Sequence, residues 1–150
     1  MEKIIKLRKL FKTLNLDGYI IPKNNNFFGE YISESEDNLK YISNFTGSAG
    51  FAVILKNKNY MFVDGRYTIQ AGIQCGKQFQ ICNIPKKYPF NVFKKKKLCL
   101  GFDPKLHTKN SLNKFFEKTF IKFKPINKNL IDQLWKKKEA THMKPFYLIK

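Results

Sequence analysis

The sequence predicts an α/β fold in which helices cover both faces of a mixed β-sheet. Short runs rich in β-branched and aromatic residues alternate with segments whose apolar residues recur at helical spacing. Two of the strand-like runs follow one another directly, so a hairpin interrupts the alternation, and this combination is typical of a mixed sheet. The chain has 150 residues, 43% of them hydrophobic, which is enough for one core without a second domain.

The first third of the chain predicts a helix, a buried strand and a second helix. Ile4, Leu7 and Phe11 lie on one face of an amphipathic first helix that the polar segment 15–18 ends. Residues 19–21 form a short apolar strand, and the polar residues 23–26 after Pro22 form a loop. Ser35 and the acidic residues after it offer an N-cap and first turn for a helix through residue 41.

The remainder of the chain predicts further strands and helices in alternation. Residues 51–55 and 60–63 form the hairpin, and the helix expected next covers residues 66–75. Later strands are expected at 79–84, 98–102 and 121–123, with helices at 88–96, after an N-cap at Thr108, and from Asn129 onward.

The net charge of +18 invites a nucleic-acid hypothesis, because lysines that neutralise phosphates bind with little regard to sequence. Of the 29 basic residues, however, only Arg8 and Arg66 are arginines, whereas readers of grooves and phosphates favour the guanidinium fork. We therefore interpret most lysines as solvated surface residues. The runs 94–97 and 136–138 stay open as weak contacts to a polyanion.

The cysteines and histidines predict no metal site. Cys75, Cys82 and Cys99 lack a CxxC spacing and sit among apolar neighbours, so reduced, buried thiols are expected. His107 and His142 have no carboxylate at helical spacing, and both are expected at the surface.

Three aspartates permit an alternative reading as a nuclease. Asp17, Asp64 and Asp103 each adjoin a predicted strand, where a two-metal nuclease would hold its carboxylates, although each also has a local role in a turn. Ser48 has no histidine or acidic partner near it in the sequence, so nothing supports a nucleophile there.

Two glycine-containing motifs stand at element boundaries. Residues 45–50, Phe-Thr-Gly-Ser-Ala-Gly, predict a tight connection from a helix into a strand and lack the ending of a phosphate-binding loop. Residues 64–67, Asp-Gly-Arg-Tyr, form a strand-to-helix corner in which Asp64 can cap the helix. Arg66 suits either a planar contact to a carboxylate or an internal salt bridge to Asp64 or Glu30.

Taken in order, these motifs resemble the N-terminal domain of Xaa-Pro aminopeptidases, the aminopeptidase P family of metallopeptidases. The resemblance runs from residue 3 to about residue 136, through the segments 16–22, 29–31, 41–54, 63–71, 101–104 and 129–135. It implies a creatinase-type N-terminal domain with a ribonuclease H-like mixed sheet flanked by helices. In that family a separate catalytic domain with two ions, usually Mn²⁺, removes the N-terminal residue preceding proline.

The resemblance also implies roles and boundaries for this chain. It assigns no catalytic residue, metal ligand or cofactor to the chain, and it places Phe45, Ser48, Arg66 and Tyr67 in the substrate-site wall or an interface. Residues 1–138 would be the domain and 139–150 the start of a linker, so that the chain is a fragment or split subunit that is inactive alone. The implied partners are the remaining peptidase domains or another subunit, and a peptide with proline at its second position.

Two further expectations concern the cellular compartment of the protein and a loop whose sequence differs from that of the family. The charged N-terminal helix and the absence of a long apolar run predict a cytoplasmic protein without membrane contact, and nucleic acid is not the expected partner. Family members typically carry Asp-Glu-His where this chain has Asn25, Asn26 and Phe27, which leaves the role of that loop open. The alternative functions are a free-standing basic domain that binds polyanions or a protein, and the nuclease.

Overall fold

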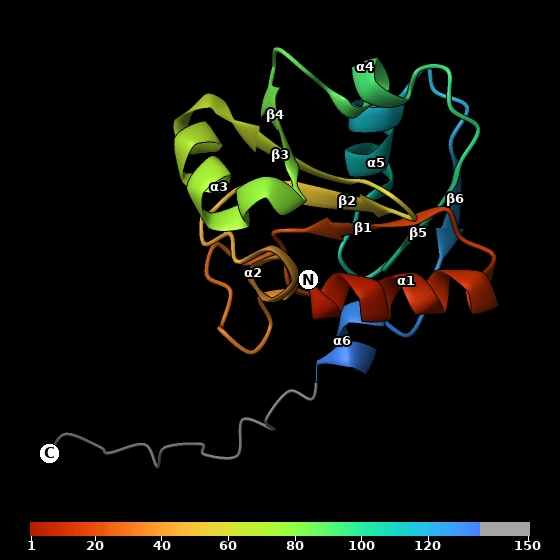
Figure 1. The fold of residues 1–150 in the computed structure, drawn as a ribbon, viewed down its shortest axis with the longest axis horizontal. Helices are drawn as coiled ribbons and strands as arrows, with labels where there is room; N and C mark the ends of the chain where they lie inside the picture. Colours follow the sequence, from red (N-terminus) through yellow and green to blue (C-terminus); the bar gives the residue numbers. More distant parts are fainter. Residues whose placement is uncertain (136–150) are drawn as a thin grey trace, which may run out of the picture.

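A β-sheet with helices on both sides forms the middle of the molecule (Figure 1). The computed structural model describes residues 1–135. Within them the sheet has six strands in the order β4-β3-β2-β1-β5-β6. The strands are β1 (Gly18–Pro22), β2 (Phe51–Leu55), β3 (Asn59–Asp64), β4 (Gln80–Ile84), β5 (Cys99–Phe102) and β6 (Lys122–Pro125).

Both strand orientations occur in the sheet. β2 pairs antiparallel with β1 and with β3, whereas the pairs β3–β4, β1–β5 and β5–β6 are parallel. The predicted mixed sheet and its hairpin are therefore confirmed. As a consequence, the carboxyl ends of β1, β3 and β5 and the amino end of β2 lie at one edge of the sheet.

Helices cover both faces of the sheet. α1 and α6 lie on one side and α4 and α5 on the other, with α3 beside β3 and β4 (Figure 1). The helices are α1 (Glu2–Leu14), α2 (Asn38–Ser43), α3 (Thr68–Cys75), α4 (Pro89–Phe93), α5 (Lys109–Phe116) and α6 (Leu130–Leu134). Two short 3₁₀ turns, Gly65–Tyr67 and Gly76–Gln78, flank α3.

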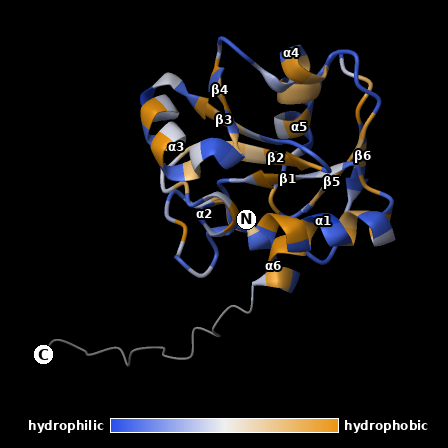
Figure 2. Cartoon of the chain, viewed as in Figure 1, coloured by the Kyte–Doolittle hydropathy of each residue, from blue (hydrophilic) through white to orange (hydrophobic). Residues whose placement is uncertain are grey.

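Successive side chains of a strand point to opposite faces of the sheet, and the molecule therefore has one hydrophobic core on each face. Tyr19 and Ile21 point toward the core that α1, α2, α3 and α6 cover, while Ile20 between them belongs to the core under α4 and α5. In α1, hydrophobic residues recur between hydrophilic ones along the turns (Figure 2), so Leu7 and Phe11 are fully buried while lysines face outward.

Local capping chemistry sets several helix ends. Asn15 takes a left-handed conformation after α1, and Thr108 and Asn129 cap α5 and α6 as predicted. The predicted cap at Ser35 is wrong. Asp37 caps α2 instead, because its carboxylate accepts a hydrogen bond from the backbone N–H of Lys40 at 3.0 Å.

Candidate functional site

The four residues predicted for a substrate-site wall meet at one edge of the sheet. Phe45 and Ser48 belong to the connection 44–50 between α2 and β2, and Arg66 and Tyr67 belong to the 3₁₀ turn after β3. These two segments adjoin because Phe51, at the start of β2, pairs with Phe62 near the end of β3. We call the connection 44–50 together with residues 64–67 the β3 corner.

Asp64 holds the guanidinium of Arg66 in one orientation. The Nε and Nη2 atoms of Arg66 donate to the two carboxylate oxygens of Asp64 at 3.2 and 2.8 Å, and the backbone N–H of Arg66 donates to the same carboxylate at 2.9 Å. These bonds lower the pKa of Asp64 and raise that of Arg66. Asp64 and Glu30 were the two internal partners expected for Arg66, and the salt bridge forms with Asp64.

Arg66 keeps capacity for another partner. Its side chain is 77% exposed, and a guanidinium has five N–H groups, of which Asp64 occupies two. One face of the guanidinium lies over the ring of Tyr67, with 5.4 Å between its central carbon and the ring centroid. Arg66 can therefore offer oriented donors to an anionic group while it remains bonded to Asp64.

Tyr67 is itself fixed from two directions. Its hydroxyl lies 2.6 Å from the Oγ atom of Ser48, a distance typical of a hydrogen bond between hydroxyls. Its ring packs edge to face with the ring of Phe45, at an interplanar angle of 87° and with the ring centroids 6.0 Å apart. Phe45 itself is fully buried. The β3 corner thus forms one continuous set of contacts from the core to Arg66.

Glycine makes the connection 44–50 possible. A Cβ at Gly47 would lie 2.2 Å from the ring of Phe45, so no side chain fits there. Gly50 has a φ of 149°, and a Cβ there would lie 2.9 Å from the carbonyl oxygen of Phe62. The tight connection predicted from the two glycines is therefore observed.

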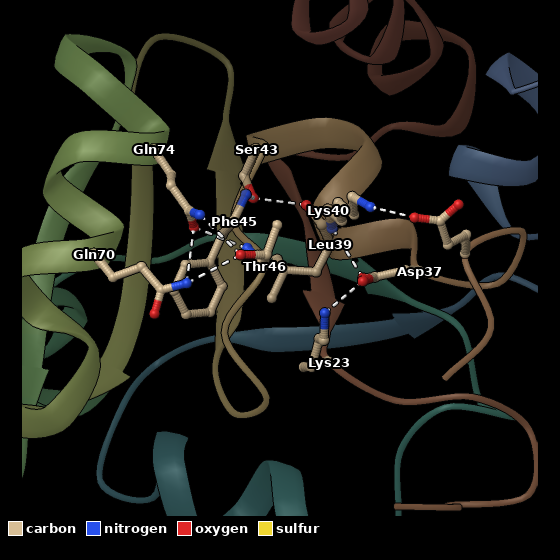
Figure 3. A network of polar contacts seen from close by, with 10 residues as sticks. Lys23, Asp37, Leu39, Lys40, Ser43, Phe45, Thr46, Gln70 and Gln74 are labelled. Carbon is tan, nitrogen blue, oxygen red and sulfur yellow. Dashed lines mark hydrogen bonds and ion pairs between the residues drawn. The ribbon is translucent and has the colours of Figure 1, made fainter. Parts of the chain in front are cut away.

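Side chains of α3 hold the same connection from outside. The backbone N–H of Thr46 donates to Gln74 at 2.9 Å, and the Thr46 hydroxyl accepts bonds from Gln70 at 3.0 Å and Gln74 at 2.8 Å (Figure 3). No motif in the sequence predicts a role for these two glutamines. Their spacing of four residues places both glutamines on one face of the helix predicted at residues 66–75, and this spacing indicates that they can bind the same neighbouring segment.

A buried ion pair supports the neighbouring loop. Lys23 follows β1 and pairs with Asp37, the N-cap of α2 (Figure 3). The side chains of Lys23 and Asp37 are 8% and 9% exposed. The pair joins the end of β1 to the helix that leads into the β3 corner. The loop between them is organised by Asn25, whose Oδ1 accepts from the backbone N–H groups of Phe27 and Gly29, both at 3.1 Å.

A cavity of about 330 Å³ opens beside the β3 corner. It lies between the sheet and α5, and Phe51, Phe62 and Phe115 are among the aromatic residues that line it. Asp64 and Lys114 are among the polar residues that line it.

His107 also lines this cavity, and its expected surface position is wrong. The side chain is largely buried and packs edge to face on Phe102, with ring centroids 5.8 Å apart. Burial lowers its pKa to about 4, so the imidazole is neutral near pH 7. His142 lies outside the described residues.

The three aspartates of the nuclease hypothesis do not converge. Asp17 precedes β1 at the opposite edge of the sheet, where it bonds to Lys56 and to the backbone N–H of Cys99. Asp103 is buried and bonds to Asn129. Within residues 1–135 no three His, Cys, Asp or Glu side chains could together hold a metal ion, and Cys75, Cys82 and Cys99 are free thiols.

The model for the Creatinase/Prolidase N-terminal domain matches residues 3–134 of the chain. The chain belongs to this family. The predicted boundary between domain and linker, at residues 138 and 139, lies outside the described residues.

Curated relatives carry the name of the predicted enzyme family. The chain is 34% identical over 143 residues to a probable Xaa-Pro aminopeptidase P of Talaromyces marneffei, and 31% identical over 143 residues to one of Laccaria bicolor. Each comparison covers 89% of this chain and 22% of the relative. This creatinase/prolidase-type chain therefore spans less than a quarter of these relatives.

Solved structures support the same assignment. The chain matches the X-prolyl aminopeptidase of Caenorhabditis elegans, described as a cytosolic enzyme with a di-nuclear active site, with a TM-score of 0.78 at 27% identity, over 89% of this chain and 25% of that one. The N-terminal domain of PepQ from Mycobacterium tuberculosis shares the fold with a TM-score of 0.67 at 18% identity, over 89% of this chain and 98% of that one. No helix in residues 1–135 has the length and apolar character needed to cross a membrane.

Proposed function

We propose that this chain serves as the non-catalytic N-terminal domain of an Xaa-Pro aminopeptidase that removes the N-terminal residue preceding proline. Membership in the creatinase/prolidase N-terminal family and the names of the relatives support this proposal. The described residues offer no metal-binding set, so the two Mn²⁺ ions of the proposed enzyme would belong to a catalytic domain outside this chain. The cytoplasm is the compartment that we propose for it.

The observation that carries the proposed role is the fixed, exposed guanidinium of Arg66. Asp64 and Tyr67 orient it, while the three remaining N–H groups leave it able to bind a carboxylate of the peptide or an acidic group of another domain. Phe45, Ser48 and Tyr67 would form the wall that supports it. Preorganised donors of this kind position a substrate at low cost in entropy.

The test uses the longest reading frame that contains this chain, established by sequencing the coding DNA beyond Lys150. With Xaa-Pro peptides, Arg66→Ala should lower kcat/KM by about tenfold or more, because a hydrogen bond to a charged group contributes about 1.5–3 kcal/mol. Arg66→Lys should recover only part of the loss, since lysine cannot present a fork. Lys77→Ala, at another exposed basic residue, is the control. Unchanged kcat and KM in Arg66→Ala would refute this role.

Contacts to other domains or subunits form the second part of the proposal. Ile69 and Ile73 lie four residues apart on α3 and are both highly exposed, as are Phe27 and Tyr31 in the loop after β1. Large apolar side chains that gather at the surface are typical of interaction sites. Replacing Ile69 and Ile73 with glutamine should weaken such an assembly, measured by analytical ultracentrifugation, without changing the fold of the isolated chain.

A specific observation also favours the alternative of a polyanion-binding domain. Exposed lysines lie at the edge of the sheet opposite the β3 corner. Lys97 and Lys122 line a hollow with Phe120. Lys58 and Lys96 both lie near the ring of Tyr60.

Chromatography on heparin tests this alternative, because binding through many lysines weakens steeply as salt rises. Glutamine at residues 94–97 should reduce the salt concentration needed for elution. Failure of the wild-type chain to bind heparin at low salt would exclude the alternative.

A further inference from the structure

We propose that the cavity beside the β3 corner binds an aromatic side chain of a peptide that carries a negative charge close to that ring. The inference deepens the proposed function and rests on it for the peptide nature of the ligand. Arg66 itself does not line the cavity, and the two sites share Asp64, which pairs with Arg66.

The size of the cavity limits its occupant. Its volume of about 330 Å³ lies at the lower end of the range of about 300–1,000 Å³ that is common for ligand pockets. One aromatic side chain with its adjoining backbone fits this space, whereas a dinucleotide or another large cofactor does not.

The walls select for an apolar ring. Phe51 lies with its ring centroid 4.9 Å from those of both Phe62 and Phe115, so the three rings pack as one aromatic cluster, in which Phe62 is fully buried. Ile20 and Leu112 are further apolar members of the lining. Water against such walls makes few hydrogen bonds, so a ring that displaces it gains affinity, and offset or edge-to-face contacts add specificity.

The charge at the mouth selects for an anion next to the ring. Lys114 is exposed, lines the cavity and lies with its Nζ atom 5.8 Å from the centroid of Phe115. Within residues 1–135 it takes part in no ion pair. The other charges on the lining are compensated, because Lys23 is paired with Asp37 and Asp64 with Arg66. The free ammonium of Lys114 therefore favours a carboxylate.

The test uses the complete 150-residue chain and three small probes. N-acetyl-L-phenylalanine has both the ring and the carboxylate, its methylamide has only the ring, and N-acetyl-L-alanine has only the carboxylate. Titration followed by amide NMR should show saturable shifts at the cavity residues with the first two probes. For ligands of this size we expect a dissociation constant on the order of a millimolar for the carboxylate.

Two variants and one control define the site. Ala49→Phe places a ring at the exposed rim of the cavity and should weaken binding of N-acetyl-L-phenylalanine about tenfold or more, since the space is then filled. Ile73→Phe introduces the same ring on the exposed face of α3, away from the cavity, and should leave binding unchanged. Lys114→Gln should abolish the preference for the carboxylate over the methylamide while the ring still binds.

The outcomes separate this inference from the proposed function. Equal binding of the phenylalanine and alanine probes, no saturable shifts at the cavity, or full affinity in Ala49→Phe would each overturn the inference. A normal rate for Arg66→Ala in the enzyme assay would instead refute the role of Arg66 and leave the cavity result standing.

Discussion

Breaking the buried ion pair between Lys23 and Asp37 should destabilise the chain strongly. Asp37→Asn removes the negative charge and keeps an oxygen that can still accept the backbone N–H of Lys40, so the cap of α2 survives. The side chain of Lys23, only 8% exposed, then holds a charged ammonium without its partner. Loss of one member of a buried pair costs about 3–5 kcal/mol, so we expect that decrease in the free energy of unfolding.

Glu34→Gln is the matched control for this prediction. It is the same carboxyl-to-amide exchange in the same segment, but the pair of Glu34 with Lys40 is exposed and should contribute little to stability. Urea unfolding followed by circular dichroism gives both values. A cost for Asp37→Asn as small as that for Glu34→Gln would refute the argument, because it would show that the Lys23 ammonium reaches water without the pair.

Three further predictions concern the β3 corner and its surroundings. Gly50→Ala should destabilise the chain by about 1–3 kcal/mol because Gly50 has a positive φ. Gly72→Ala, within α3, should stabilise the chain by about 0.5–1 kcal/mol, because no atom lies within 4 Å of the added Cβ. Equal effects of the two variants in thermal unfolding would contradict this. Thr46→Val removes the hydroxyl that accepts from Gln70 and Gln74 but keeps the backbone bond to Gln74, and it should speed hydrogen exchange at the amides of residues 45–50. Unchanged protection there would show that the hydroxyl contacts do not hold the connection. The pKa of His107 is about 4 in the folded chain, below its ordinary value of 6.5, so the unfolded chain binds the proton first as the pH is lowered. The free energy of unfolding should therefore decrease by up to about 3 kcal/mol from pH 6.5 to pH 4. His107→Gln should show a smaller decrease in unfolding experiments across that range.

The sequence predicts those parts of the fold that depend on local chemistry. Thr108 and Asn129 cap helices because their side chains reach backbone groups two or three residues away, and Asp64 bonds to Arg66 within the same turn. The β-rich runs 51–55 and 60–63, joined by the short polar segment 56–59, predict a hairpin for the same reason. Each of these contacts lies within a few residues, so pattern and spacing suffice.

Contacts between distant segments could not be predicted in the same way. Only the family resemblance assigns Ser48 and Tyr67 to the same wall or interface, and the bond between them joins residues 19 apart. The burial of His107 depends on the packing of its loop against Phe102 and the sheet, which no local pattern encodes. The local pattern favours Ser35 as the cap of α2, whereas the observed cap, Asp37, also pairs with Lys23, which lies 14 residues earlier in the chain.

The pairing of Arg66 with Asp64 determines how this site would recognise a ligand. A flexible arginine loses up to about 2 kcal/mol of rotamer entropy when it is fixed, and here Asp64 and Tyr67 have already fixed it in the free domain. The same pairing cancels the charge of Arg66 at a distance, so the β3 corner attracts anions weakly and selects them through the geometry of its donors. Binding at Arg66 should therefore depend little on salt, in contrast to the steep dependence expected of the lysines around residues 94–97. Salt dependence thus distinguishes a contact at the β3 corner from one at the opposite edge of the sheet.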